Sequence, residues 1–276
     1  MKRILWIASY PKSGNTFIRS LLTSLIFTED GNFEFNLLKK IKQFDIRENY
    51  NFVNQINPID YINLNDIKIS SKYWIEAQKK INEAFIFKTH AANLMYNNYK
   101  YTNENMSLGV IYILRDPRDV AVSYSHHMNE DINLTVNRMF DLKAGIKSGA
   151  ELVQLPLSSW DIHIKSWETL NVPKIIIKYE DLVNHTLKVF EELIYFLKNK
   201  LKINFNLNED KFNNILKTTE FKTLQHKETA ETFQENFKGR NFFRSGKPLK
   251  GSELDDINKN KIISNFQETM KKYNYI

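Results

Sequence analysis

Four short apolar runs, each ending in a turn or in polar residues, constrain the fold of this chain more than any other feature. The first run, residues 3–9 (RILWIAS), is followed by a turn with proline and glycine, and then by apolar residues at helical spacing from Asn15 to Phe27. The other runs are Ala84–Lys88 (AFIFK), Gly109–Leu114 (GVIYIL) and Lys174–Lys178 (KIIIK). Runs of this length and composition are typical of buried strands. The chain is therefore expected to begin with a strand–loop–helix unit.

Helical patterns fill most of the chain between and after these runs. Strands that alternate with helices indicate an α/β protein with a central parallel sheet flanked by helices. We expect one domain over residues 1–276, with a strand–loop–helix nucleotide site like that of P-loop kinases. In such sheets ligands bind beyond the carboxyl ends of the strands. The clearest helical segments are Ser71–Asn82, Pro117–Met128, Ser158–Leu170 and Glu180–Asn199, with a final helix near Ser252–Tyr273.

Two segments interrupt this alternation. Residues 29–69 have weak periodicity and many asparagines, so a mobile or substrate-facing insertion and an irregular surface segment are equally consistent with them. Residues 227–251 are polar and contain Gly239, Gly246 and Gly251, which predicts a long loop before the last helix. Loops of this length tend to be functional lids or disordered segments.

The cysteine count and the charge limit the classes of function. The chain has no cysteine, which removes disulfides, thiolate nucleophiles and cysteine-based metal sites. Its formal net charge of +7 fits a nucleic-acid partner or an anionic small ligand, but the lysines are scattered and no basic block occurs. We therefore expect no nucleic-acid partner.

The apolar residues of the N-terminus do not form a targeting or membrane segment. Ile4–Ala8 follows Lys2 and Arg3, but it is shorter than the roughly 7–15 residues of a signal-peptide core. No apolar stretch approaches the roughly 18 residues that a membrane span needs. The sequence predicts a soluble, cytoplasmic protein without stable membrane insertion.

The turn after the first strand has the residues of an anion site. It reads YPKSGNTF and leads into a helix, whose N-terminus exposes backbone N–H groups and the positive end of the helix dipole. Gly14 permits a tight backbone path and Lys12 adds a positive charge. The pattern is not a Walker A loop. An ordinary strand–helix turn is the alternative, but the lysine inside the turn favours anion binding; further donors come from Ser13, Asn15 and Thr16.

A lysine and a histidine follow the second strand. The segment reads Phe87-Lys88-Thr89-His90, and both charged side chains are expected to reach the crevice beyond the sheet. Histidine has an unperturbed pKa near 6.5 and suits proton abstraction at neutral pH. Taken alone, a histidine in such a position is more often a surface or helix-capping residue than a catalytic base.

An arginine ends the third strand, in LRDPRDVAVS. Asp116 can cap the next helix and Pro117 suits its first turn. Arg115 and Ser123 could bind one phosphate from two sides, the arginine as a fork and the serine as a donor. The alternative is that Arg115 forms a salt bridge with Asp116 or Asp119.

Together, these segments resemble the cytosolic-type family of sulfotransferases that use 3′-phosphoadenosine 5′-phosphosulfate (PAPS). The family's 5′-phosphosulfate loop is matched by YPKSGNTF, and its 3′-phosphate motif by LRDPRDVAVSY. The segment with its catalytic histidine is matched by FKTH, and the segment whose tyrosine lines the nucleotide site by IIIKYEDL. A weaker match, NFFRSG at Asn241–Gly246, resembles the loop that covers the nucleotide.

The resemblance implies a role for each matched residue. Lys12 would contact the bridging oxygen and stabilise the leaving 5′-phosphate. Arg115 and Ser123 would bind the 3′-phosphate, which distinguishes PAPS from ATP-like ligands. The other nucleotide contacts would come from the backbone of Ser13, Gly14, Asn15 and Thr16, from Phe17 against the adenine, from Tyr179, Thr219 and Phe221, and from Arg244, Ser245 and Gly246 over the 3′-phosphate.

The reaction implied is in-line transfer of the sulfuryl group to a hydroxyl. His90 would remove the acceptor's proton, while Lys12 and Lys88 offset developing negative charge. The products would be the sulfated acceptor and 3′-phosphoadenosine 5′-phosphate (PAP). No metal ion is implied. The histidine base favours a small alcohol, phenol or lipid-like acceptor over a polysaccharide.

Some features depart from this pattern or support other functions. Arg244-Ser245-Gly246 lacks the tryptophan that follows in the family, and the family's dimer signature is absent, so the oligomeric state stays open. A P-loop-type kinase would need a Walker lysine and magnesium-binding carboxylates. A non-catalytic nucleotide-binding protein would not need Lys12, Lys88 and His90 together. Outside the motifs, His163 is expected in packing or hydrogen bonding, and His126 and His127 at a helix end.

Overall fold

The chain folds around a four-stranded parallel sheet, with the strand order β2-β1-β5-β8. The computed structural model describes residues 3–81, 84–146, 153–230, 243, 246–249 and 251–276. The predicted α/β fold with a central parallel sheet and flanking helices is confirmed. All four predicted strands are present: β1 (Ile4–Ser9), β2 (Ile86–Thr89), β5 (Ser107–Leu114) and β8 (Lys174–Lys178).

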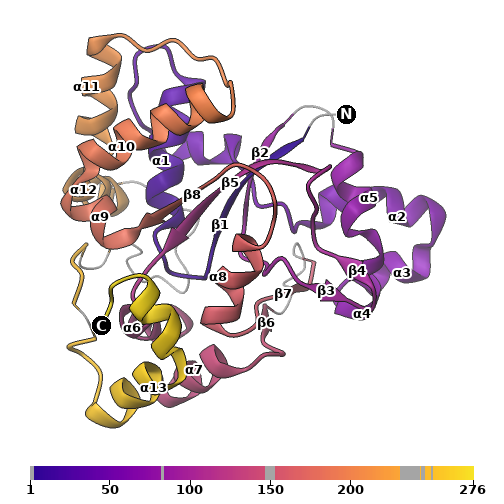
Figure 1. The fold of residues 1–276 in the computed structure, drawn as a ribbon. Coiled ribbons are helices and arrows are strands. Elements are labelled where there is room, and N and C mark those ends of the chain that lie inside the picture. The colour runs from indigo at the N-terminus through magenta and orange to yellow at the C-terminus, as the bar shows by residue number, and fades with distance from the viewer. Residues whose placement is uncertain (1–2, 82–83, 147–152, 231–242, 244–245, 250) are drawn as a thin grey trace.

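The alternation of side chains along each strand gives the sheet two buried faces. Trp6 and Ala8 of β1 belong to one hydrophobic cluster, which includes residues of helix α8 (Trp160–Glu168). Leu5 and Ile7 belong to the other, which includes residues of helices α1 (Asn15–Phe27) and α10 (Thr186–Tyr195). Successive strand residues point to opposite faces, so an apolar run without polar interruptions needs helices on both sides. Figure 1 shows these helices around the sheet.

The remaining elements are mostly short. Two small hairpins pair β3 (Met95–Tyr96) with β4 (Tyr99–Lys100) and β6 (Gly145–Ile146) with β7 (Leu155–Pro156). The α-helices are α1 (Asn15–Phe27), α2 (Asn51–Ile56), α3 (Pro58–Ile62), α4 (Ile67–Ser70), α5 (Trp74–Lys79), α6 (Pro117–Met128), α7 (Ile132–Phe140), α8 (Trp160–Glu168), α9 (Tyr179–Asn184), α10 (Thr186–Tyr195), α11 (Glu209–Thr218), α12 (Phe221–Ala230) and α13 (Asp256–Lys272).

The helix expected over residues 180–199 is broken. The chain forms α9, then α10, and then a π-helical turn at Phe196–Lys200. His185, between the first two, has φ −136° and ψ 43°, which lies outside the helical region. The break reorients the chain, so that Val189, Phe190 and Leu193 of α10 can be buried in the same cluster as α1.

Residues 29–69 are not an irregular surface segment. They contain two 3₁₀ turns, Phe35–Lys40 and Arg47–Tyr50, as well as α2, α3 and α4. Gln43 forms a parallel bridge with Lys88, because the Lys88 N–H donates to the Lys42 carbonyl at 3.0 Å and the Phe44 N–H to the Lys88 carbonyl at 2.9 Å. The segment thus extends the sheet beyond β2 and holds the end of that strand.

The C-terminal part of the chain contains α12 and α13, and α13 packs against α6, α7 and α8. Residues 227–230 of the loop expected over 227–251 belong to α12, which continues to Ala230, and residues 231–242, 244–245 and 250 lie outside the described residues. Helix α13 lies beside α6 and α7 in Figure 1. Over the described residues, no helix is long and apolar enough to cross a membrane.

Candidate active site

The register of the parallel strands brings the predicted site residues to one edge of the sheet. Ala8 pairs with Thr89, and Ser9 with Ile113. Leu114 pairs with Lys178. The residues that follow these positions are Tyr10, His90, Arg115 and Tyr179, so all four strands end at the same level. The sequence prediction that the motifs meet beyond the carboxyl ends of the strands is confirmed.

The loop after β1 has a backbone path that suits an anion. Lys12 has φ 66° and Gly14 has φ 101°, both in the left-handed region. A Cβ on Gly14 would lie 2.6 Å from Cδ2 of Tyr179, so only glycine fits beneath that ring. Gly14 is the N-cap of α1, and no side chain caps this N-terminus. The first N–H groups of the helix therefore face the loop, where a phosphate or sulfate would find donors.

The side chains of Ser13 and Asn15 differ in their hydrogen bonding. Ser13 is buried, and its hydroxyl has no hydrogen-bond partner within the described part of the chain. A buried hydroxyl without a partner is costly and indicates a missing ligand atom or water. Asn15 instead donates to the Ile7 carbonyl and to the Ser9 hydroxyl, both at 3.2 Å. The Asn15 side chain therefore holds the end of β1, and only its backbone is directed to the loop.

Arg115 joins the first and third strand ends. Its Nη1 donates to the Lys12 carbonyl at 2.9 Å, and its guanidinium carbon lies 4.2 Å from the centre of the Tyr179 ring. Its Nε is buried without a partner among the described residues. The alternative of a salt bridge to Asp116 or Asp119 is not what the structure shows, because these carboxylates have other partners.

The two acidic residues of this motif hold the surrounding chain. Asp116 pairs with Arg118 at 2.5 Å and caps α6 through the Arg118 N–H at 2.9 Å. Asp119 accepts the N–H groups of Leu249 at 2.8 Å and Gly251 at 2.7 Å. Ser123 lies one helical turn after Asp119 and is partly buried. The C-terminal loop is thus attached to the helix that carries Ser123.

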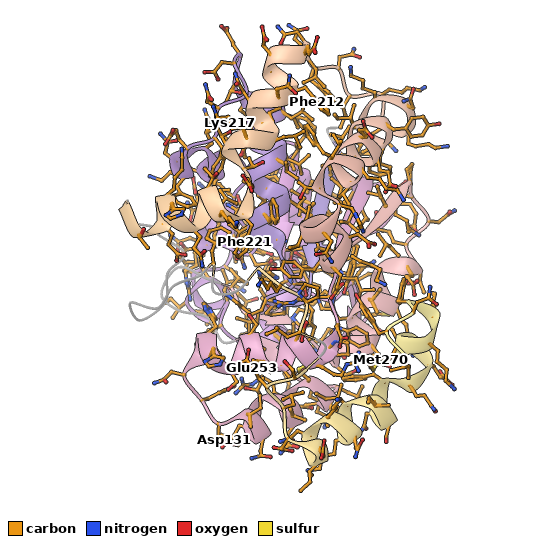
Figure 2. All side chains as sticks on the ribbon, turned by 90° about the vertical axis from the view of Figure 1, so that its left-hand side faces the viewer. Asp131, Phe212, Lys217, Phe221, Glu253 and Met270 are labelled. Atoms are coloured by element: carbon orange, nitrogen blue, oxygen red, sulfur yellow. The ribbon has the colours of Figure 1, made fainter. Side chains whose placement is uncertain are left out.

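Aromatic rings form the other wall of the predicted nucleotide site. The Phe17 and Phe221 rings lie 6.4 Å apart, and Phe221 and Phe243 lie 5.7 Å apart. A Cβ on Gly246 would lie 2.4 Å from Phe221, so the loop packs directly on this ring. Figure 2 shows Phe221 at the start of α12. Thr219 is wholly buried, with its hydroxyl donating to the Ile215 carbonyl at 2.7 Å. Arg244 and Ser245 lie outside the described residues.

The geometry around His90 settles its tautomer. Nδ1 lies 2.8 Å from the Ser9 carbonyl oxygen and 3.3 Å from the Ser9 hydroxyl. Because a carbonyl oxygen can only accept, Nδ1 carries the proton and the lone pair of the neutral ring is on Nε2. Lys88 lies on β2, two residues before His90, which directly follows the strand, so the alternation of side chains puts the two on the same side.

Sequence reasoning gave no catalytic weight to the buried His163, yet this residue contacts the His90 backbone. Its Nε2 lies 3.1 Å from the His90 carbonyl, and its Nδ1 lies 2.8 Å from the Tyr112 hydroxyl. Burial lowers the pKa of His163 to about 3, so the ring is neutral. The expectation of a packed, hydrogen-bonded histidine is confirmed. Its partner could not be read from the sequence, because 73 positions separate the two histidines.

Asp45 was not identified as a site residue from the sequence. Its carboxylate accepts from the Thr89 hydroxyl at 2.8 Å and from the Tyr101 hydroxyl at 3.0 Å. Burial raises the pKa of Asp45 to about 7, although both hydrogen bonds oppose this shift. Asp45 lies in a segment with weak periodicity, which offered no signal for its position beneath Thr89.

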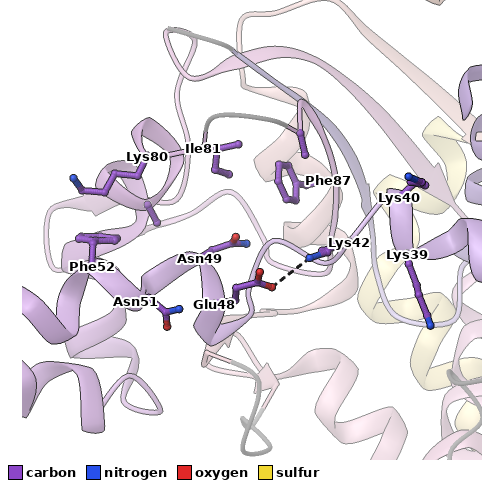
Figure 3. Close-up of a pocket in the computed structure, with 12 residues that line it drawn as sticks. Lys39, Lys40, Lys42, Glu48, Asn49, Asn51, Phe52, Lys80, Ile81 and Phe87 are labelled. Carbon is purple, nitrogen blue, oxygen red and sulfur yellow. Dashed lines mark hydrogen bonds and ion pairs between the residues drawn. The ribbon is translucent and has the colours of Figure 1, made fainter.

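A cavity of about 590 Å³ lies beside the outer edge of β2. Figure 3 shows Phe52 and Phe87 among its lining residues, and the ion pair between Lys42 and Glu48, at 3.3 Å. Phe87 is adjacent to Lys88 in the chain. The cavity is lined by residues between Lys39 and Phe52 and by Ala77, Lys80, Ile81, Ala84 and Phe87.

The histidines at the end of α6 lie at the surface. His126 is exposed, and its Nε2 lies 3.6 Å from a carboxylate oxygen of Glu253, which is labelled in Figure 2. Over the residues that the structure describes, no group of three or more His, Cys, Asp or Glu side chains is arranged to hold a metal ion.

The four parallel strands define an α/β protein, and their carboxyl ends bring a left-handed loop, an arginine and a histidine together as a candidate anion site. The family described as "Sulfotransferase domain" matches residues 2–274. The chain belongs to this family.

Curated relatives and a solved structure are consistent with this membership. The chain is 27% identical over 226 residues to luciferin sulfotransferase of Photinus pyralis, covering 80% of the chain and 56% of that protein. It is 28% identical to sulfotransferase 1E1 of Cavia porcellus, covering 80% and 66%. The chain thus spans less than two thirds of either relative. The structure of mouse sulfotransferase SULT7A1 complexed with PAP superposes with a TM-score of 0.62 at 19% identity, over 98% of this chain and 84% of that one, which supports the fold.

Proposed function

We propose that the protein transfers the sulfuryl group of PAPS to a hydroxyl group of a small molecule. The observation that carries this proposal is the register that sets the loop of Lys12 and Gly14 beside His90 at adjacent strand ends. An anion site beside a histidine whose Nε2 holds the lone pair suits a reaction in which an anionic leaving group departs and a proton is removed.

The donor nucleotide would lie across the strand ends. In this proposal the backbone of residues 13–16 holds the phosphosulfate, and Arg115 with Ser123 binds the 3′-phosphate. Two observations support this placement: the hydroxyl of Ser13 and Nε of Arg115 are buried without partners among the described residues. Both are donors that an anionic phosphate oxygen could satisfy. Phe17, Tyr179, Phe221 and Gly246 would surround the adenosine.

The chemical step needs one base and fixed positive charges. Nε2 of His90 takes the proton of the acceptor hydroxyl while that oxygen forms a bond to sulfur. The bond between sulfur and the bridging oxygen breaks, and its electron pair leaves with the 5′-phosphate of PAP. Lys12 and Lys88 stabilise the charge on the bridging and sulfuryl oxygens, without a metal ion. Positively charged groups fixed where charge develops contribute strongly to catalysis.

The acceptor is proposed to be a small alcohol, phenol or lipid-like molecule. The name of the Photinus pyralis relative, luciferin sulfotransferase, refers to a small-molecule acceptor, which supports this class. The cavity beside β2 has mixed apolar and lysine walls, which suit such a molecule. We place the reaction in the cytoplasm and expect no nucleic-acid partner.

Binding of the nucleotide product tests the donor site. PAP at 100 times its Kd should stabilise the protein by about 2.7 kcal/mol. ATP and 5′-AMP at the same concentration should give much smaller shifts in Tm, because neither has a 3′-phosphate for Arg115 and Ser123. Equal shifts with all three nucleotides would contradict the donor assignment.

Substitution of His90 tests the base. His90→Ala should lower the rate of transfer from labelled PAPS, in a screen of hydroxyl acceptors read by mass, by about 10²–10⁴-fold. The variant should keep its affinity for PAP. The exposed His185 provides the matched control, and His185→Ala should retain full activity. Loss of PAP binding in His90→Ala would indicate a structural role for this residue instead.

A further inference from the structure

We propose that His163 is a positioning residue for the reaction: through the His90 main-chain carbonyl, it holds the catalytic histidine in register with Ser9. This inference rests on the proposed sulfuryl transfer. It concerns how the base is oriented, and it assigns to a buried residue of α8 a role in the rate of transfer.

A directed chain of hydrogen bonds carries the inference. The Tyr112 hydroxyl lies 2.8 Å from Nδ1 of His163, and Nε2 of His163 lies 3.1 Å from the His90 carbonyl. Since that carbonyl can only accept, Nε2 of His163 carries the proton and Nδ1 accepts from Tyr112. Both donors, the Tyr112 hydroxyl and Nε2 of His163, therefore point toward the His90 backbone.

The neighbouring residues of α8 hold the same stretch of backbone. Trp167 Nε1 donates to the Ala91 carbonyl at 2.9 Å, and the Asn93 N–H donates to the Ser166 hydroxyl at 2.9 Å. With His163, one face of α8 thus contacts three of the four residues that follow β2. Helix α8 packs on one face of the sheet, in the same hydrophobic cluster as Trp6 and Ala8 of β1, and Figure 1 shows it beside the strands.

His163 differs from the other two contacts because it acts on His90 itself. The imidazole of His90 donates through Nδ1 to Ser9 at 2.8 Å, and this bond needs the His90 backbone at its present height above the sheet. Displacing that backbone would loosen the Nδ1 bond and release the ring to the other tautomer. A displacement of about 1 Å at a reacting group can cost about 10²-fold in rate.

The charge state of His163 suits this role. The ring is wholly buried, and burial holds its pKa near 3, so it stays neutral through the physiological range. A neutral donor fixes the backbone without repelling the imidazolium that forms on His90 during transfer. His163 is therefore a fixed support and does not itself titrate during the reaction.

Two substitutions of His163 separate positioning from packing. His163→Gln places an amide N–H where Nε2 stands, whereas His163→Phe fills the volume without a donor. We expect His163→Phe to lower kcat about 10–100-fold, with KM for PAPS and Kd for PAP within about twofold of the original values. His163→Gln should recover kcat to within about threefold. Trp160→Phe, on the same helix but packed against Phe266 at 5.1 Å, is the control for disturbance of α8.

A second readout needs no donor nucleotide. In the ligand-free protein, long-range ¹H–¹⁵N spectra of the His90 ring should show the Nδ1–H tautomer in the original chain and in His163→Gln. In His163→Phe they should show a mixture of tautomers. If His163→Phe fails to fold, Tyr112→Phe removes only the hydroxyl that orients His163 and should shift the tautomer in the same direction.

Two results would overturn the inference. The first is a His163→Phe variant with unchanged kcat and an unchanged His90 tautomer. The second is a loss of kcat that is equal in His163→Phe, His163→Gln and Trp160→Phe and follows their Tm values. Failure of the proposed function would look different, because the original chain itself would then show no transfer and no preference for PAP, while the tautomer measurement would still be informative.

Discussion

Asp45 is a carboxyl group buried beneath the segment that carries Lys88 and His90. The Thr89 and Tyr101 hydroxyls donate to it, and Thr89 Oγ1 also accepts the Ala91 N–H at 2.9 Å. No lysine or arginine is among the groups that shift its pKa, which burial raises to about 7. The carboxyl is thus expected to be protonated in the folded protein under mildly acidic conditions, while it ionises near 4 in the unfolded chain.

This difference predicts that Asp45 makes the protein less stable as the pH rises. A pKa that is higher in the folded state means that the folded protein binds more protons between about pH 4 and 7, so stability falls with pH across this window. From pH 5 to pH 8 the Asp45 contribution should fall by about 2–3 kcal/mol. The titratable neighbours Tyr50 and Tyr101 do not interfere, because burial raises the pKa of each well above its usual value.

Asp45→Asn tests the prediction, because the amide cannot ionise. Urea unfolding at pH 5 and pH 8 should give a variant that gains stability relative to the original chain as the pH rises. The m-value should stay unchanged, and all other titrating groups cancel in the difference between the two proteins. A constant difference between the proteins at the two pH values would mean that Asp45 is ionised throughout or that its pKa is not raised.

At the residue scale, the sequence could predict which residues belong to the candidate site, but not which other residues they contact. Lys12, His90 and Arg115 were identified because each follows an apolar run typical of a strand. Such a run can be recognised from neighbouring residues in the sequence alone. The roles assigned to them stay predictions. Asp45 and His163 could not be found in this way, because their partners Thr89 and His90 are 44 and 73 positions away and depend on how the layers pack.

The C-terminal loop and α6 interact through one carboxylate. Asp119 is buried and accepts both the Leu249 and the Gly251 N–H groups. Ser123, predicted to bind the 3′-phosphate, lies one turn further along the same helix. A Cβ on Gly251 would lie 2.6 Å from Cβ of Arg118, so the loop approaches the helix backbone closely. Asp119 therefore attaches the predicted nucleotide-covering loop to the helix that forms the floor of the site.

Asp119→Asn should weaken this attachment, because the amide keeps one acceptor oxygen and presents an NH₂ group to the other N–H. We expect the affinity for PAP to fall about tenfold, since a lost hydrogen bond to a charged group costs about 1.5–3 kcal/mol. Trypsin should also cleave the loop faster. Asp131→Asn is the matched control, because Asp131 caps α7 through Asn133 at 2.8 Å and asparagine is an equally good N-cap. Unchanged PAP affinity in Asp119→Asn would show that the attachment of the loop through Asp119 does not contribute to nucleotide binding.

At the element scale, local patterns predicted the strands and most helices. The four strands, α1 and α6 agree with the sequence because each combines an apolar pattern with a clear end, such as Pro117 at the start of α6. Residues 29–69 were ambiguous, since their order depends on pairing with β2 through Gln43 and Lys88. The break between α9 and α10 at His185 was missed because the apolar pattern continues across it. Such a pattern does not show where the helix axis changes direction.

At the scale of the whole molecule, the end of the chain packs against the third and fourth strand ends. The Tyr275 hydroxyl donates to Glu180 at 3.1 Å, and Arg118 Nη2 donates to the Tyr275 carbonyl at 2.9 Å. Lys178 Nζ lies 4.6 Å from the centre of the Tyr275 ring. Glu180 in turn accepts the Asp116 N–H at 3.0 Å. The last residues thus connect the ends of β5 and β8, beside Arg115 and Tyr179.

This arrangement predicts that Tyr275 supports both stability and nucleotide binding. Burial raises the pKa of Glu180 and the Tyr275 hydroxyl opposes that shift, so Tyr275→Phe removes one of the donors that stabilise the ionised carboxylate. We expect Tyr275→Phe to cost about 1 kcal/mol of stability. Tyr275→Ala also removes the ring over Lys178 and should cost about 2–3 kcal/mol.

The effect on binding follows from the position of Glu180. When its bond to Tyr275 is lost, Glu180 holds the Asp116 N–H and the start of α6 less firmly, and Arg115 immediately precedes that point. Tyr275→Ala should therefore weaken PAP binding several-fold, measured by titration calorimetry below the Tm of the variant, whereas Tyr195→Ala, at an exposed tyrosine of α10, should not. A Tyr275→Ala protein that loses stability but binds PAP with the original affinity would show that the chain end stabilises the fold without shaping the donor site.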